Sequence, residues 1–290
     1  MIEIEQLAAL DLCAWTGSQS EAARILNTDQ STVSRSLYKS QKLLSSIGIN
    51  PDPIRKYAFR DNQDILKDQR RLHQLIRLLQ GKGLRIQATC WGRHLLLEPT
   101  PEGWIPNKAA INNFKHCETL QLLEEHIIDA ALVTNPEAPP ASDQRYARYH
   151  LSNQPLFLLI PKTHILANEH GLSSGEVTRH SELGHSGFVS KECRGVMEKL
   201  DQVLFGAQEF QHTSSYKEPP SHTRRYGTAM TMLIRPDLTR LDLAVEFPAG
   251  DILIVKQELA EHPEILRLVL ELKKRLGLLQ PKINGLEIAD

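Results

Sequence analysis

The chain has 290 residues, of which 41% are hydrophobic and 24% are charged. This length predicts about two domains, and the composition excludes a disordered acidic tail and a fibrous repeat. No apolar run approaches the roughly 20 residues that cross a bilayer, and the acidic start Met-Ile-Glu-Ile-Glu lacks the form of a secretory signal. We therefore expect a soluble cytoplasmic protein with no membrane partner.

The net charge of −1 hides an asymmetry. Residues 1–83 hold 12 Lys and Arg against 9 Asp and Glu, whereas residues 84–290 hold 22 against 26. Within residues 31–60 there are six basic residues and one acidic residue. A basic patch on one small domain is typical of a polyanion-binding surface, although a solvated basic face gives the same count.

Three short helices are predicted at the N-terminus. The first covers residues 4–16, with Leu7, Leu10 and Ala14 on one face, and ends at Gly17. The sequence Ser-Gln-Ser-Glu at 18–21 is a capping box, in which the serine oxygen accepts from the Glu21 N–H and the glutamate reaches back. The second helix follows with Ala22, Ala23 and Leu26 inward, and ends at Asn27, which tolerates a left-handed backbone.

A third helix, capped by Thr28 or Asp29, buries Val33 and Leu37. Together the three segments predict a helix-turn-helix. The outer face of the third helix is polar, and Gln and Arg can read base edges while Ser, Thr and Lys suit phosphates. The outer face of this helix and the basic residues after it supply the candidate DNA-binding residues. These are Gln30, Ser31, Thr32, Ser34, Arg35, Lys39, Lys42, Arg55, Lys56 and Arg60. A three-helix interaction module with a soluble face remains an alternative.

Residues 17–26, Gly-Ser-Gln-Ser-Glu-Ala-Ala-Arg-Ile-Leu, followed by residues 30–37, Gln-Ser-Thr-Val-Ser-Arg-Ser-Leu, resemble the helix-turn-helix of LysR-type transcriptional regulators. The departures are Gln19 for an aromatic residue, Ser31 for a common proline and Ser40 for a leucine. The usual stretch leading to the wing is missing, and we interpret Lys56–Arg60 as a shortened wing strand whose basic residues grip the DNA backbone.

A polar helix is predicted from Asp61 to Leu79, capped by Asp61 or Asn62 and ended by Gly81 and Gly83. Its residues Ile65, Leu72 and Leu79 are a heptad apart, with Leu75 and Ile76 between them, and such a stripe suits a partner helix. An amphipathic helix packed on its own domain is the alternative. The resemblance favours dimerisation, because family members pair through a linker helix here.

After Gly83 the pattern changes to alternating strands and helices, which predicts an α/β domain. Strands are predicted at 84–89, 129–133 and 155–160, and helices at 118–126 and 263–276. Residues 187–190, 228–234 and 252–255 are strand or buried-helix candidates. Two segments, 122–133 and 154–167, are similar to segments of the LysR effector domain, which is built from two α/β lobes like a periplasmic binding protein.

Ligands in open α/β lobes bind beyond the carboxyl ends of strands, where helix N-termini offer free N–H groups. The residues predicted at such ends are Thr89, Cys90, Thr119, Thr134 and Ser190, and they are the candidate effector contacts. The resemblance supports the Thr89 and Thr119 positions in particular, since family members commonly hold a small anionic effector there with hydroxyls. Helix caps and strand-end hydrogen bonds are the other interpretation, and Glu118 disfavours a simple carboxylate ligand.

Enzyme and metal chemistry are not predicted. No H-E-x-x-H, G-x-S-x-G or G-x-x-x-x-G-K-[ST] motif occurs, so we expect no catalytic residue, no metal and no cofactor. His180, His185 and Cys193 match no standard metal spacing. Cys90 and Cys117 could form a redox pair if they cap neighbouring strands, but buried inert thiols are favoured. No C-x-x-C pair occurs, so neither a disulfide framework nor a zinc knuckle is expected.

The sequence therefore predicts an α+β multi-domain protein. A winged helix-turn-helix covers residues 1–60, a linker and dimerisation helix 61–81, and a two-lobed effector domain 84–290, with lobe I at about 84–153 and 257–290 and lobe II at about 154–256. The predicted function is a sequence-specific regulator that binds double-stranded DNA as a homodimer or homotetramer, under the control of a small-molecule effector. The alternatives are a ligand-binding or protein-interaction module whose degenerate motif no longer binds DNA, and a regulator that needs no effector.

Overall fold

The computed structural model describes residues 2–46, 64–88, 93–107, 116–135, 138–178, 225–243 and 247–289. The chain forms two compact units, and each is described by itself. Unit 1 consists of residues 1–88, 100–113 and 118–131, and unit 2 of residues 89–99, 114–117 and 132–290. Unit 1 thus contains the predicted helix-turn-helix domain (the head), the linker helix and part of the predicted effector domain. The boundary between the two units therefore differs from the predicted domain boundaries.

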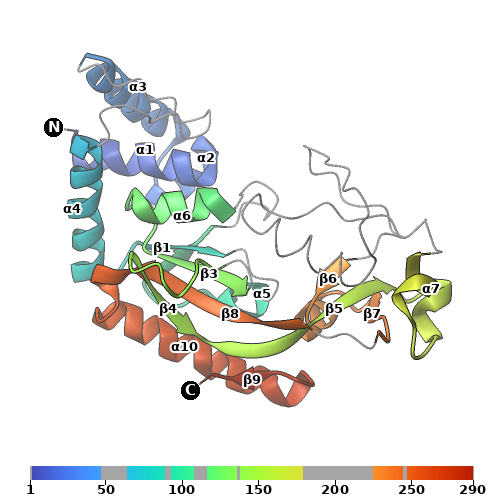
Figure 1. Cartoon of the computed structure of the whole chain (residues 1–290). Helices are drawn as coiled ribbons and strands as arrows, with labels where there is room; N and C mark the ends of the chain where they lie inside the picture. Colours follow the sequence, from blue (N-terminus) through green and yellow to red (C-terminus); the bar gives the residue numbers. More distant parts are fainter. Residues whose placement is uncertain are drawn as a thin grey trace. The chain divides into compact units, whose positions relative to one another are not determined.

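Unit 1 begins with the three predicted helices, α1 (Ile4–Thr16), α2 (Gln19–Leu26) and α3 (Gln30–Ser46), which pack on one another (Figure 1). Gly17 ends α1 with a left-handed φ of 66°, and the Ser18 Oγ accepts from the Glu21 N–H at 3.2 Å, as predicted. The second hydrogen bond of the predicted capping box, from the Ser18 backbone N–H to the Glu21 carboxylate, does not form. The Ser18 N–H donates instead to the Thr16 Oγ1 at 3.2 Å, and the Glu21 carboxylate pairs with Arg24.

Helix α1 is buried on more of its surface than the predicted stripe. Leu7 and Leu10 are buried as expected, but so are Leu12 and Trp15, while Ala14 is half-buried. Trp15 contacts the strand region of the same unit, where the Asn107 amide donates to the Trp15 carbonyl at 3.1 Å. The Trp15 Nε1–H donates to Gln87 Oε1 at 2.9 Å in the same region.

Two parallel strands belong to unit 1, β1 (Leu84–Ala88) and β2 (Trp104–Pro106), with Leu84 opposite Trp104 and Ile86 opposite Pro106. The strand predicted at residues 84–89 is confirmed as β1, and all five of its residues are buried although apolar and polar residues alternate along it. The polar members, Arg85 and Gln87, are buried because both make side-chain hydrogen bonds inside the unit. Helix α6 (His116–Glu124) follows close to its predicted bounds.

Helix α4 (Asp64–Gln80) is the predicted linker helix, and it ends at Gly81 with φ 60°. Its capping candidates Asp61 and Asn62 lie outside the described residues. The buried side of this helix carries four polar side chains, Arg70, His73, Gln74 and Arg77, beside the leucines Leu66 and Leu78. A helix normally buries its apolar stripe, but α4 packs on its own unit with this largely polar side.

A buried ion network pairs the two arginines of that face with carboxylates. The Arg70 guanidinium donates to Asp11 of α1 at 2.7 Å and to Glu125, which follows α6, at 2.8 Å. Arg77 makes two hydrogen bonds to Asp129, at 2.8 and 3.2 Å, and Asp129 also accepts the Arg85 backbone N–H at 2.7 Å. The network therefore fixes helix α4 to both the head and the strands of unit 1.

The same network keeps His73 neutral. The pKa of His73 is lowered to about 4, mainly by burial and then by the positive charges of Arg77 and Arg85. The pKa of Arg85 is lowered to about 9, mainly by burial and next by the positive charge of Arg77. His73 consequently carries no charge at neutral pH.

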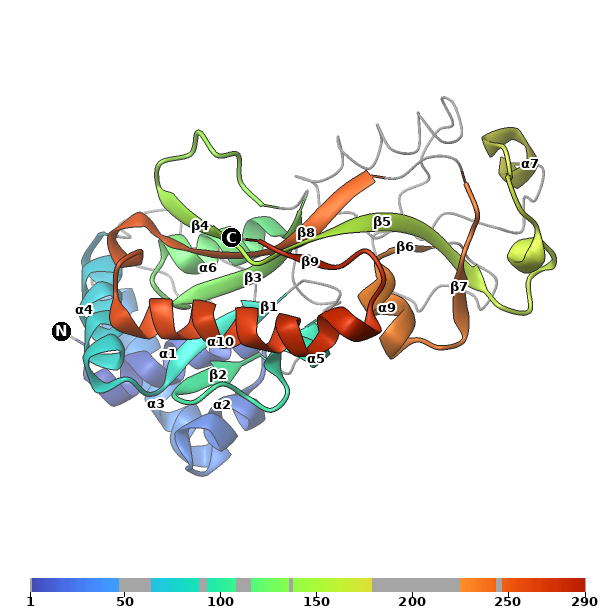
Figure 2. The same ribbon diagram turned by 90° about the horizontal axis from the view of Figure 1, so that it is seen from below.

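Unit 2 contains the two longest strands of the described chain. Strand β5 (Ser152–Pro161) extends the predicted segment 155–160, and strand β8 (Phe247–Lys256) confirms the candidate at 252–255 as a strand. Strand β8 pairs antiparallel with β5 and with the preceding strand β4 (Tyr146–His150), and it neighbours β3 (Ala130–Asn135). Figure 2 shows β5 and β8 running side by side.

The pairing of β8 changes register where β4 passes into β5. His150 lies opposite Ile252, whereas Gln154 lies opposite Ala249, so four residue steps on one strand face three on the other. One extra residue in a strand is a β-bulge, which bends the strand and re-aims side chains. The extra residue lies between His150 and Gln154, and Gly250 and Asp251 of β8 lie opposite it.

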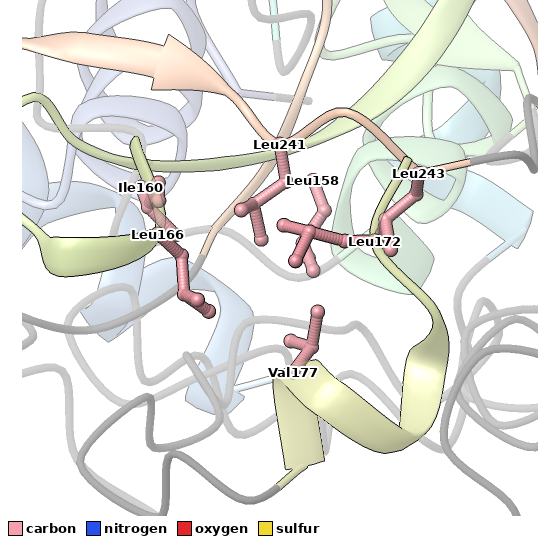
Figure 3. Close-up of a cluster of buried hydrophobic side chains, with 7 residues drawn as sticks. All are labelled: Leu158, Ile160, Leu166, Leu172, Val177, Leu241 and Leu243. Atoms are coloured by element: carbon pink, nitrogen blue, oxygen red, sulfur yellow. The ribbon is translucent and has the colours of Figure 1, made fainter. Parts of the chain in front are cut away.

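The far half of β5 pairs with β6 (Arg225–Gly227) and β7 (Leu238–Arg240). A hydrophobic core packs on this half of the strand together with helix α7 (Ser174–Thr178) and the 3-10 turn η2 (Ile165–Asn168) (Figure 3). Its members are Leu158, Ile160, Leu166, Leu172, Val177, Leu241 and Leu243. All seven residues fall within the segment 154–256 that we predicted as lobe II, and the lobe itself stays a prediction.

The remaining elements of unit 2 are α5 (Arg93–Leu97), α9 (Ala229–Ile234), the 3-10 turns η3 (Gln257–Leu259) and η4 (Gln280–Lys282), α10 (Pro263–Leu279) and β9 (Glu287–Ile288). The segment predicted as a strand or buried helix at 228–234 is helix α9. The predicted closing helix at 263–276 is confirmed as α10, whose inward leucines include Leu268, Leu272 and Leu276. The candidate at 187–190 lies outside the described residues.

Candidate nucleic-acid interface

Helices α2 and α3 are joined by the three residues Asn27, Thr28 and Asp29. Asn27 has the predicted left-handed backbone, with φ 51°, and its N–H returns to the carbonyls of Ala23 and Arg24. Ala22 and Ala23 are buried, and their small side chains let α3 cross closely. The predicted helix-turn-helix requires two helices joined by a tight turn of this kind.

Helix α3 is anchored by its inner face. Val33 and Leu37 are buried as predicted, and Leu44 extends the stripe. Ser40, which stands where the family pattern has a leucine, is also fully buried, and its hydroxyl donates to the Ser36 carbonyl at 2.9 Å. A serine satisfied in this way can occupy an apolar position without an unpaired polar group.

The outer face of α3 is open to solvent in the single chain. The predicted contacts that are exposed are Gln30, Ser31, Ser34, Arg35, Lys39 and Lys42, and Thr32 is half-buried. Tyr38 is exposed among them. The Arg35 guanidinium is held over the first turn, where it donates to the Ser31 carbonyl at 3.3 Å and the Thr32 Oγ1 at 3.2 Å.

The charge of α3 has one sign. Arg35, Lys39 and Lys42 are exposed, and the segment 30–46 contains no acidic residue. Such a face attracts phosphates, and the guanidinium and amide side chains on its first two turns have the donor and acceptor geometry for base edges. Lys56 and Arg60 of the predicted wing strand, and the candidate Arg55 before it, lie outside the described residues.

The apolar stripe of α4 faces away from unit 1. Leu72, Leu75 and Leu79 have exposed fractions of 59%, 43% and 84%, and Ile76 is half-buried. The alternative that this stripe packs on its own domain is therefore wrong for these three leucines, because the polar face of the helix occupies that place. A row of leucines on one exposed helical face suits a second apolar helix.

The predicted effector contacts are described in part. Thr119 of α6 is fully buried in unit 1, and Thr134 of β3 is buried in unit 2. Thr89, Cys90 and Ser190 lie outside the described residues. Their common role as ligand contacts stays a prediction.

The sequence analysis missed a buried polar group in unit 2, the Asp251 carboxyl of β8, which lies opposite the bulge. It has no exposed surface, and its Oδ2 accepts from the Ser152 hydroxyl at 3.0 Å and the Gln154 amide at 3.2 Å. Burial raises the pKa of Asp251 to about 6, against smaller opposing effects of the Ser152 and Thr134 hydroxyls. A lone acid directly before the apolar run Ile-Leu-Ile-Val was the signal in the sequence.

Metal and redox sites are not found among the described residues. No group of three or more His, Cys, Asp or Glu side chains there could hold a metal ion. Cys13 is a buried free thiol, and burial raises its pKa to about 11. His180, His185, Cys90 and Cys193 lie outside the described part of the chain. No helix in that part is long and apolar enough to span a bilayer.

No family model and no curated protein matches the sequence. The fold does match solved structures along almost their whole length. Full-length CbnR complexed with its target DNA is 15% identical, with 94% of this chain and 99% of that chain covered at a TM-score of 0.50. A full-length single-residue variant of OxyR from Pseudomonas aeruginosa is 16% identical, with 94% and 95% covered, also at 0.50.

A second structure of CbnR, described as a LysR family transcriptional regulator, covers 94% of this chain and 99% of that chain at 16% identity and a TM-score of 0.45. The two matches at 0.50 span both predicted regions, the head and the effector domain. The chain thus shares the fold of full-length LysR-family regulators, as the resemblance of its sequence implied.

Proposed function

We propose that this protein is a LysR-type transcriptional regulator that binds double-stranded DNA through the exposed face of α3. The observation that carries the proposal is an outward helical face with three cations, no acid, and Gln30 and Arg35 on its first two turns. The shared fold supports it, because CbnR was solved on its target DNA. The winged form of the head, the two ligand-binding lobes and the control by a small effector belong to the proposal.

The salt dependence of duplex binding tests this function. Phosphate contacts release counterions, so the logarithm of the binding constant should fall linearly with the logarithm of salt concentration, with a slope of about −0.9 for each phosphate contact. Binding of random-sequence and selected duplexes by the full chain should both show a steep slope. A flat slope would instead support a module whose motif no longer binds DNA.

Replacing Arg35 by alanine should weaken binding to the selected duplex by about 1–3 kcal/mol, because a guanidinium that reads a base edge is lost. Fluorescence anisotropy gives the affinity of each variant for the selected and the random duplex, and the ratio of these two affinities measures sequence readout. Arg267→Ala is the matched control, since Arg267 is an exposed arginine on α10 that pairs with Glu264. An unchanged ratio of selected to random affinity would remove Arg35 from sequence readout.

The exposed leucines of α4 support a homodimer, with a homotetramer as a further assembly. Leu72→Gln combined with Leu79→Gln should weaken dimerisation by about tenfold or more, since each fully buried leucine contributes about 1.5–3 kcal/mol. Sedimentation equilibrium over a range of concentrations measures the change. Ile165→Gln is the control, because Ile165 is 72% exposed on η2. Equal dimerisation of both variants would show that the chain pairs through another surface.

A further inference from the structure

Tyr38 is a large aromatic side chain on the outward face of α3, and the proposed function leaves it without a role. Its exposed fraction is 67%. Residues three or four apart are neighbours on a helix surface, so Tyr38 shares one row with Ser31, Arg35 and Lys42. Among the residues that the structure describes, none forms a hydrogen bond with the Tyr38 hydroxyl. The packing of the three helices therefore does not require an aromatic side chain at this position.

Two cations lie on either side of Tyr38 along this row. Arg35 precedes it by one turn and Lys42 follows it by one turn, and both are exposed. The Arg35 guanidinium donates to the Ser31 carbonyl and the Thr32 hydroxyl, so it is directed toward the first turn and away from the phenol. An anion that binds between the two cations can therefore accept a hydrogen bond from the phenol, since a tyrosine hydroxyl is a donor.

The distance of Tyr38 from the start of α3 favours a phosphate over a base edge as its partner. The first residues of the second helix of a helix-turn-helix contact base edges in the major groove. Helix α3 begins at Gln30, and eight residues of helix place Tyr38 about 12 Å further along the axis. The major groove is itself about 12 Å wide. When Gln30 contacts a base, Tyr38 therefore lies at the margin of the groove, where the phosphates are.

From these observations we infer that the Tyr38 hydroxyl donates a hydrogen bond to a phosphate of the DNA backbone. The inference rests on the proposed function and assigns a contact within the same face of α3. Tyrosine is among the side chains that make such contacts, which position a protein on the duplex without reading sequence. A neutral donor releases no counterion, so this contact adds affinity that is independent of salt concentration. Tyr38 thus differs in kind from the cations beside it.

Tyr38→Phe in the full chain tests the contact because it removes the hydroxyl and keeps the ring. Binding to the selected and the random duplex should weaken to the same extent, by about three- to tenfold, since one neutral hydrogen bond is lost. The slope of the logarithm of the binding constant against the logarithm of salt concentration should not change. Lys39→Gln is the comparison, because loss of a charged phosphate contact should make that slope less steep by about 0.9. Fluorescence anisotropy over a range of salt concentrations measures both effects.

Selected duplexes that carry a neutral methylphosphonate in place of one phosphate locate the contact. An ionised phosphate oxygen accepts a stronger hydrogen bond than a neutral oxygen does. At one phosphate of each half-site, the replacement should therefore weaken binding by the unchanged protein more than binding by Tyr38→Phe. Two changes that act on the same contact are not additive, whereas independent changes are. Additive losses at every phosphate position would show that the hydroxyl contacts none of them.

Tyr149→Phe is the matched control, because it removes the hydroxyl of a tyrosine in unit 2 that donates to the Ala260 carbonyl. This variant should bind both duplexes with the affinity of the unchanged protein. Since Tyr38 is exposed, Tyr38→Phe should keep the melting temperature of the unchanged protein, so that a loss of affinity reports on the duplex contact.

The possible results separate this contact from the proposed function. Equal duplex affinity of Tyr38→Phe and the unchanged protein, with a steep salt slope for both, would overturn the role of Tyr38 alone. A loss confined to the selected duplex would also overturn it, because the side chain would then read a base and not a phosphate. Absence of duplex binding by the unchanged protein would overturn the proposed function, and the contact with it.

Discussion

Replacing Arg70 by alanine should lower the free energy of unfolding by about 3–5 kcal/mol. Arg70 is fully buried and pairs with Asp11 at 2.7 Å and Glu125 at 2.8 Å. Its removal leaves two carboxylates in the interior of unit 1 with their main cationic partner gone, and the cost of an uncompensated buried charge exceeds the value of the pair itself. Urea denaturation followed by circular dichroism measures the change.

Arg24→Ala is the control for this variant, because Arg24 is an exposed arginine of the same unit that pairs with Glu21. Its loss should cost no more than about 1 kcal/mol. A triple variant, Asp11→Asn with Arg70→Met and Glu125→Gln, removes all three charges and should recover much of the stability lost by Arg70→Ala. Similar small losses for Arg70→Ala and Arg24→Ala would contradict a buried network.

Gly250→Ala should destabilise unit 2 by about 3 kcal/mol or more. A Cβ at this position would overlap the backbone carbonyl oxygen of Ser152 and lie 3.0 Å from its carbonyl carbon. Backbone cannot move aside like a flexible side chain, so β5 and β8 would have to separate at the bulge. Thermal and urea unfolding measure the loss.

Gly175→Ala in α7 provides the comparison, since a Cβ there would meet no atom closer than 4.0 Å. That change should be neutral or slightly stabilising, because alanine has the higher helix propensity. If both alanine variants unfolded alike, the close approach of β5 and β8 at Gly250 would be disproved.

The elements with local signals could be predicted from the sequence. Gly17, Ser18 and Asn27 mark helix ends through their own backbone preferences, and the spacing of Val33 and Leu37 identifies the inner face of α3. These signals lie within a few residues of the structure that they determine. The polar outer face of α3 followed from the same periodicity.

The buried charges could not be predicted in this way. Arg70 and Arg77 look like the solvent-facing side of a polar helix, yet their partners Asp11, Glu125 and Asp129 lie more than 50 residues away along the chain. Hydrophobic periodicity assigns such residues to the surface, and only the fold supplies their partners. Asp251 was missed for the same reason, since its neighbours come from two other strands.

The ion network also decides how this protein can be recombined with its structural relatives. A chimera joined at Gly81 or Gly83 would keep helix α4 but lose Glu125 and Asp129, the acceptors of Arg70 and Arg77. In the transplanted segment Arg70 would keep Asp11 as its one acidic partner from this network, whereas Arg77 would lose the Asp129 carboxylate. Functional exchange of the N-terminal helices therefore requires that residues 118–131 be transferred with them, or that Arg77 be replaced by an apolar side chain of similar volume.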